Sequence, residues 1–162
     1  MFNQMQQVPE EGDLAPDIAV SDDHGTPFQL IGLRGKKVVL YFYPKADTPG
    51  CTVEACEFRT RMADFNSAGS VVLGISPDGS SEQAAFRNKF NLPFKLLADS
   101  QHQAAEAYGV WKERVIDGKK MMAVERTTYI IDESGVIRKI FRNVRPEGHA
   151  SEVYNALREL NG

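Results

Sequence analysis

The chain has 162 residues, of which 42% are hydrophobic and 25% are charged, and its formal net charge is −3. This size and composition are typical of one soluble globular domain, so we assign residues 1–162 to a single domain that begins with a loose segment over residues 1–12. The small negative charge excludes a general attraction to nucleic acid or to an anionic membrane. No apolar stretch reaches the ~18 residues of a membrane span, and the N-terminus lacks the apolar core of a secretory signal. We therefore expect a cytoplasmic protein.

Turn-forming residues divide the chain into short strands and helices. In chain order, the pattern predicts a hairpin at 14–20 and 26–30, a strand at 38–43, a helix from about 51 past 65, a strand at 71–76, a helix at 80–90, a strand at 94–98, a helix at 99–108, two short extended pieces on either side of a turn at 117–118, a hairpin at 127–131 and 136–141, and a helix at 150–160. Ser80 and Gln83 have the spacing of a capping box. Strand and helix alternate before a terminal hairpin and helix. This order predicts the α/β class, a thioredoxin-like fold in which helices flank a central mixed sheet, with an N-terminal hairpin extension.

Both cysteines lie in residues 44–56, PKADTPGCTVEAC, directly after an apolar strand. Pro44 cannot donate a hydrogen bond to a sheet, and residues 47–50 are turn formers. A helical apolar face begins at Ala55, and one turn earlier the same helix contains Cys51. The free N–H groups and partial positive charge of a first helical turn favour a thiolate, the nucleophilic form of cysteine. Cys51 could also be a small buried apolar residue, but its position favours a reactive thiol.

The spacing of the two cysteines limits what they can do. On an ideal helix, five residues separate the Cα atoms of Cys51 and Cys56 by roughly 8–9 Å, beyond the ~7 Å limit for a disulfide. Either the two sulfurs never bond, or the first turns of the helix unwind to let them bond. The spacing is neither the C-x-x-C of thioredoxin-like reductases nor half of a paired C-x-x-C zinc site.

Pro44, Thr48 and Cys51 form the pattern P-x-x-x-T-x-x-C, and the wider text YFYPKADTPGCTVEACEFR resembles the peroxiredoxins, specifically the bacterioferritin-comigratory or PrxQ-like group. GDLAPDI, AYGVW and ERTTYIID resemble other landmarks of that family, so the resemblance covers residues 12–160. It implies a thiol peroxidase whose Cys51 attacks hydrogen peroxide or an alkyl hydroperoxide and becomes a sulfenic acid. It also implies that Cys56 then forms a disulfide with Cys51, which a dithiol donor such as thioredoxin reduces.

The resemblance assigns roles to neighbours of Cys51. The Thr48 hydroxyl and the N–H groups at the helix start are candidates to stabilise charge on the peroxide, and Pro44 is a candidate to limit the access of water. From sequence alone, Thr48 could be only a turn hydroxyl, and Pro44 could be only the residue that ends the strand. Arg126, in ERTTYIID, stands where the family has an active-site arginine, and a guanidinium keeps its charge and donates several hydrogen bonds. Without the resemblance, Arg126 would be interpreted as a solvated charge at the end of a strand. Glu54 is a candidate to hold the arginine.

We expect no cofactor and no metal, because the three histidines, His24, His102 and His149, lack metal-ligand spacing and are expected to be exposed. The expected partners are a peroxide and thioredoxin, and the chain itself is expected to be a monomer or a weak homodimer. Two other functions stay open. A protein disulfide reductase is disfavoured by the cysteine spacing and because no proline lies between Pro93 and Pro146, where such a reductase carries a cis-proline. A non-enzymatic redox sensor or binding module would use the same cysteines to change shape on oxidation.

Overall fold

The computed structural model describes residues 8–161, with side chains to residue 160. A seven-stranded sheet has the order β2-β1-β5-β4-β3-β8-β9, and β6 and β7 form a separate two-stranded sheet. The strands are β1 (Ala19–Asp22), β2 (Pro27–Gln29), β3 (Lys37–Phe42), β4 (Ser70–Ser76), β5 (Lys95–Ala98), β6 (Trp111–Ile116), β7 (Lys119–Val124), β8 (Thr127–Ile131) and β9 (Ile137–Phe141). The helices are η1 (Leu30–Leu33, a 3-10 helix), α1 (Pro49–Thr60), α2 (Met62–Ser67), α3 (Ser80–Phe90), α4 (Gln103–Ala107) and α5 (His149–Asn161).

The large sheet is mixed, as the alternation of elements predicts. β3 pairs in parallel with β4, and β4 pairs in parallel with β5. β8 pairs antiparallel with both β3 and β9. The N-terminal hairpin of β1 and β2 extends the sheet at its other edge, where β1 pairs antiparallel with β5. These pairings confirm a central mixed sheet with an N-terminal hairpin extension.

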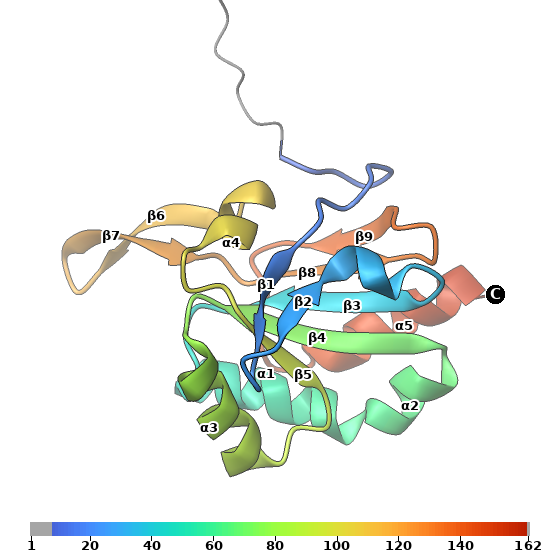
Figure 1. Cartoon of the computed structure of the whole chain (residues 1–162), viewed down its shortest axis with the longest axis horizontal. Coiled ribbons are helices and arrows are strands. Elements are labelled where there is room, and N and C mark those ends of the chain that lie inside the picture. Colours follow the sequence, from blue (N-terminus) through green and yellow to red (C-terminus); the bar gives the residue numbers. More distant parts are fainter. Residues whose placement is uncertain (1–7, 162) are drawn as a thin grey trace, which may run out of the picture.

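Helices cover both faces of the sheet, and β3 is buried between them (Figure 1). The side chains from Val38 to Tyr43 alternate between two hydrophobic cores, one on each face of the sheet. They alternate because successive residues of a strand point to opposite faces. One core, which contains Val38, Leu40 and Phe42, packs against α4 and the chain before β1. The other, which contains Val39, Tyr41 and Tyr43, packs against α1, α2, α3 and α5.

The helix expected from residue 51 past residue 65 is in fact two helices. The backbone of Arg61 leaves the helical region, with φ −101° and ψ 13°, between α1 and α2. The Arg61 guanidinium donates to Ser151 Oγ on α5 at 3.0 Å and to Asp64 Oδ2 at 2.8 Å. The break therefore accompanies tertiary contacts of Arg61, which helical periodicity alone does not show.

The capping box predicted for Ser80 and Gln83 is wrong. At the start of α3, the Gly79 N–H donates to Glu82 Oε1 at 2.9 Å. Gln83 is fully buried, and its amide group donates to Ser76 Oγ and to the carbonyl oxygen of Leu97. The polar side chain of Gln83 is therefore used to satisfy buried groups of the sheet, and the cap lies one residue earlier.

The helix predicted at 99–108 is shorter than expected, because α4 begins only at Gln103. Asp99 still satisfies its first turn, since the carboxylate accepts from the N–H groups of Ala104 and Ala105 at 3.1 and 2.9 Å. The Asp117-Gly118 turn is confirmed. Both residues have positive φ, and they join β6 to β7 as a two-residue hairpin turn, in which such dipeptides are favoured.

The N-terminal segment expected to be loose lies partly outside the described residues, namely over residues 1–7. Residues 11 and 12 of this segment are not loose, because both form hydrogen bonds with β9. The N–H of Gly12 donates to the carbonyl oxygen of Ile137 at 2.8 Å, and the N–H of Ile140 donates to Glu11 Oε2 at 3.0 Å. Within the described part of the chain, no helix combines the length and the apolar character needed to cross a membrane.

Candidate active site

Cys51 lies in the first turn of α1, at the C-terminal edge of the parallel strands. β3 ends at Phe42, and the N–H of Tyr43 donates to the carbonyl oxygen of Ile75 at 3.0 Å before the chain turns away. Thr48 is the N-cap of α1, so Cys51 is the third residue of the helix. Its side chain is almost fully buried, with 1% of the residue exposed. This edge is where open α/β sheets place their ligands.

Arg126 reaches Cys51 because of the antiparallel pairing of β8 with β3. The register pairs Thr127 with Phe42, so the residue before β8 lies beside the residues that follow β3. Arg126 Nη2 donates to Cys51 Sγ at 3.2 Å. Its Nη1 donates to Glu54 Oε1 at 3.0 Å. One guanidinium therefore joins the thiol to a carboxylate one helical turn further along α1.

Glu54 is an unusually buried carboxyl group, with 1% of the residue exposed. Burial raises the pKa of Glu54 to about 7, and the nearby Arg126 cation opposes that rise. Glu54 Oε2 has no hydrogen-bond partner among residues 8–160. The carboxylate holds the guanidinium through one oxygen only, and a proton can reside on Glu54 near neutral pH.

Gly50 makes room for this guanidinium. A Cβ at Gly50 would lie 2.7 Å from Arg126 Nη2 and 3.6 Å from Pro146 Cγ. A real Cβ does not approach a nitrogen so closely, so any side chain here would push Arg126 aside. The sequence marks Gly50 only as a turn former, and nothing in its pattern shows the approach of Arg126.

Thr48 and Pro44 lie on the loop between β3 and α1, and both are partly exposed. The Thr48 hydroxyl donates to the carbonyl oxygen of Lys45 at 3.0 Å. The hydroxyl proton is therefore engaged within the loop and is not donated toward Cys51. The structure thus brings Cys51, Arg126 and Glu54 into one hydrogen-bonded chain, with Thr48 at the N-cap three residues before the thiol.

Cys56 lies on the same unbroken helix as Cys51. Both cysteines are free thiols, and Cys56 is partly exposed whereas Cys51 is buried. α1 is continuous from Pro49 to Thr60. The arrangement is the folded-helix state, in which the ideal helical spacing keeps the sulfurs apart.

His149, which the sequence led us to expect on the surface, is buried. Its Nε2 and Thr128 Oγ1 lie 2.7 Å apart, and its Nδ1 and Glu152 Oε1 lie 2.9 Å apart. Burial lowers the pKa of His149, and Glu152 opposes that effect. Edge-on contacts with Phe58 and Phe141 complete its surroundings. α5 begins at His149, so His149 lies on the same helical face as the buried residues Val153 and Leu157.

The described residues contain no group of three or more histidine, cysteine, aspartate or glutamate side chains that could hold a metal ion. His102 stacks on the ring of Trp111, with centroids 4.3 Å apart, and pairs with Glu106. His24 is largely exposed beside Asp23.

Comparison with known proteins defines the family. Residues 12–140 match the AhpC/TSA family. The chain belongs to this family. Within the family, it is similar to Peroxiredoxin Bcp of Bacillus subtilis, with 43% identity over 152 residues that cover 94% of this chain and 97% of that protein. It is also similar to a putative peroxiredoxin bcp of Coxiella burnetii, with 47% identity over 91% of this chain and 98% of that protein.

Solved structures support the same group within the AhpC/TSA family. The bacterioferritin comigratory protein of Xanthomonas campestris, studied for alkyl peroxide reduction, superposes with a TM-score of 0.87 at 32% identity and covers 96% of this chain and 99% of that chain. A PrxQ mutant of Xylella fastidiosa gives a TM-score of 0.90 at 29% identity, again over 96% of this chain and 99% of that chain. The resemblance to Bcp and PrxQ peroxiredoxins and the thioredoxin-like fold are therefore confirmed.

Proposed function

We propose that this chain is a thiol peroxidase that reduces hydrogen peroxide or an alkyl hydroperoxide at Cys51. The observation that carries the proposal is the 3.2 Å contact between Arg126 Nη2 and Cys51 Sγ in the first turn of α1. A fixed cation and free helix-start N–H groups stabilise a thiolate, and they stabilise the charge that develops on a leaving oxygen. Relatives named as peroxiredoxins support the same activity.

The peroxide step forms one bond and breaks another. The Cys51 thiolate attacks one peroxide oxygen, and the S–O bond forms as the O–O bond breaks. The product on the protein is a sulfenic acid, and the leaving oxygen takes a proton from solvent to give an alcohol, or water from hydrogen peroxide. Arg126 can donate to sulfur and oxygen together because its guanidinium presents several N–H groups in one plane. Pro44 and Thr48 form the side of the loop along which the peroxide approaches.

Cys56 is the proposed resolving thiol. It attacks the Cys51 sulfur, water leaves, and a disulfide forms within the chain. The geometry of an intact helix keeps the sulfurs too far apart, so the start of α1 must unwind first. A dithiol donor of the thioredoxin type then reduces the disulfide by exchange, which returns both thiols to the state seen here.

The remaining proposals concern the setting of the reaction. We infer that one domain carries the activity, as a monomer or a weak homodimer in the cytoplasm, without a cofactor. Two cysteines are too few for the disulfide scaffold that is typical of small secreted domains. A redox sensor would use the same two cysteines and the same reactive thiolate, so only repeated turnover with a reductant distinguishes it from a peroxidase.

The test is peroxide consumption with thioredoxin, thioredoxin reductase and NADPH. Wild type should turn over many times, and Cys51→Ser should consume no peroxide above the blank. Substantial turnover in Cys51→Ser would overturn the assignment. Wild type that reacts with one equivalent of peroxide and then stops, although the donor is present and active on a control substrate, would favour a sensor.

A further inference from the structure

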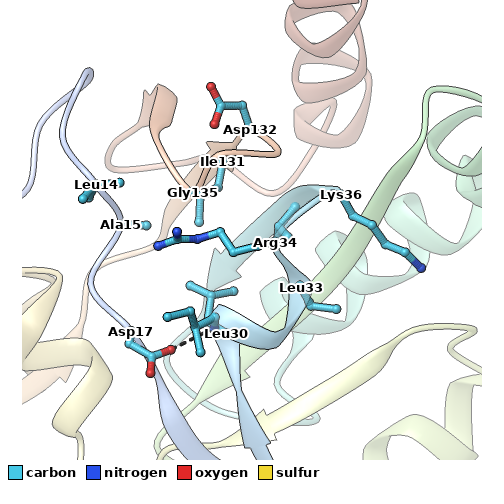
Figure 2. A pocket seen from close by; sticks show the side chains of 12 residues that line it. Leu14, Ala15, Asp17, Leu30, Leu33, Arg34, Lys36, Ile131, Asp132 and Gly135 are labelled. Carbon is cyan, nitrogen blue, oxygen red and sulfur yellow. Dashed lines mark hydrogen bonds between the residues drawn. The ribbon is translucent and has the colours of Figure 1, made fainter.

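A pocket lies at the opposite end of the sheet from Cys51, where Val38 begins the buried part of β3. It is a cavity of about 120 Å³ between η1, the chain before β1 and the turn that joins β8 to β9 (Figure 2). Val38 and Tyr43 are five residue steps apart in an extended chain, which places the pocket roughly 16 Å from the loop before Cys51. The pocket is therefore separate from the candidate active site.

The pocket is apolar inside and at its rim. Its floor consists of buried residues, namely Ala15, Leu30, Val38 and Ile131. At the rim, Leu14 and Ile31 are 63% and 51% exposed, which is high for large apolar side chains. An apolar cavity of ~150 Å³ lined by such residues is large enough for benzene, so this one has room for about five carbon atoms.

One cation faces this apolar space. Figure 2 shows the Arg34 side chain extending across the pocket, between Gly135 and Leu30, toward Ala15. Its guanidinium rests on Gly135, where a Cβ would overlap it, and Gly135 has a φ of +83° that favours glycine. The Arg34 guanidinium makes no hydrogen bond or ion pair with any residue whose side chain the structure describes.

The other charged groups of the lining already have partners in the protein or point away from the cavity. Asp17 Oδ1 accepts from the N–H groups of Ile18 and Ile31, both at 2.9 Å. Asp132 accepts from two backbone N–H groups of its own turn and pairs with Arg138. In Figure 2, Lys36 points away from the cavity. Arg34 is therefore the charge that is placed to bind a ligand in this pocket.

We propose that this pocket binds a small amphipathic monocarboxylate. Its apolar tail of about five carbons lies on the buried floor and covers Leu14 and Ile31. Its carboxylate pairs with Arg34, because a planar guanidinium matches a carboxylate with two parallel hydrogen bonds. The site does not depend on the peroxidase activity proposed for Cys51.

The test uses hexanoate and its neutral isostere hexanamide, titrated into the ¹⁵N-labelled reduced protein and followed by amide chemical shifts. Hexanoate should bind saturably with a Kd of about 1 mM, a reasonable affinity for a ligand of this size. The shifts should concentrate at residues 30–36 and 131–135. Hexanamide should bind at least about tenfold more weakly, because a hydrogen bond to a charged group is replaced by a neutral one.

Two matched variants separate charge at the pocket from charge in general. Arg34→Gln should remove the preference for hexanoate over hexanamide, whereas Lys36→Gln should keep it, since Lys36 points away. Both positions are exposed, so neither change should prevent folding, and the amide spectrum reports that directly. Equal binding of the two ligands to wild type, a hexanoate preference that survives in Arg34→Gln, or shifts centred elsewhere on the protein would overturn the proposal.

Discussion

Arg126 Nη2 donates to Cys51 Sγ at 3.2 Å, although 75 residues separate the two in the sequence. The contact depends on two features of the fold. The antiparallel register of β8 and β3 places Arg126 beside the end of β3, and Gly50 leaves space for its guanidinium. A thiol in the first turn of a helix thereby gains a second source of positive charge.

Arg126→Met should slow the reaction of the reduced protein with peroxide by about 100-fold, since a stabilising charge at a reacting centre commonly contributes ~3 kcal/mol. The rate is measured by stopped-flow fluorescence or by competition with a reference thiol peroxidase. Arg114→Met, on the exposed hairpin strand β6, is the matched control and should change the rate by less than about twofold. If Arg126→Met behaves like the control, Arg126 has no part in the peroxide step.

Gly50→Ala should slow the same step by at least about fivefold without loss of stability, because the new methyl group displaces the end of the Arg126 side chain. Alanine stabilises a helix relative to glycine by ~1 kcal/mol. The substitution should therefore leave the protein at least as stable while it slows the reaction with peroxide. Gly32→Ala is the control, because a Cβ there meets nothing within 4 Å. An unchanged peroxide rate in Gly50→Ala would show that the position of the guanidinium is not critical.

Glu54 should make the free energy of unfolding fall as the pH rises from 4.5 to about 7. Its ordinary pKa is 4.5, and burial raises the pKa of the folded state to about 7. Between these values the folded protein holds a proton that the unfolded chain has released, so this contribution is fully present below pH 4.5 and is lost toward pH 7. This difference between the two pKa values corresponds to about 3 kcal/mol of stability.

Urea unfolding of wild type and Glu54→Gln between pH 4.5 and 8 measures this effect. The stability of wild type relative to Glu54→Gln should fall by about 3 kcal/mol across the window, because the amide cannot titrate. His149 acts in the opposite direction, since its lowered pKa gives stability that is present above pH 6.5 and lost below it. Both proteins retain His149, so its contribution cancels. Parallel pH profiles for the two proteins would show that Glu54 ionises normally in the fold.

The start of α1 should open when the protein is oxidised. In the reduced protein, the N–H of Thr52 donates to the carbonyl oxygen of Thr48 at 2.9 Å, and the helix continues through Cys56. Amides of residues 52–57 should therefore be protected from hydrogen exchange in the reduced form and exposed in the disulfide form. Opening should stop near Phe58, which is fully buried and anchors the helix. A disulfide form with unchanged protection over 52–57 would rule out unwinding.

Local sequence patterns predict the frame of the site well. The apolar run before Pro44, the turn residues after it and the helical face from Ala55 place Cys51 at the start of a helix. Each of these patterns depends only on residues that are close in the sequence, so it can be recognised without the rest of the structure. The resemblance to a family was needed for Arg126, because no local pattern links a residue before β8 to a thiol 75 positions earlier.

The features that the sequence did not reveal are tertiary contacts. Gln83 resembles part of a cap, but it is buried against Ser76 and Leu97. His149 begins α5 and resembles an exposed polar residue, yet it packs against Phe58. The close approach of Arg126 to Gly50 is equally hidden, since it depends on the register of β8 with β3.

The central claim is that Cys51 attacks the peroxide and Cys56 resolves the product. Peptide mass spectrometry of the reduced protein, after one equivalent of hydrogen peroxide, tests it most directly. Wild type should lose two hydrogens and show a Cys51–Cys56 link, Cys56→Ser should gain one oxygen on Cys51, and Cys51→Ser should stay unmodified. An oxygen on Cys56 in Cys51→Ser at the wild-type rate, or oxidised wild type without the Cys51–Cys56 link, would contradict the account.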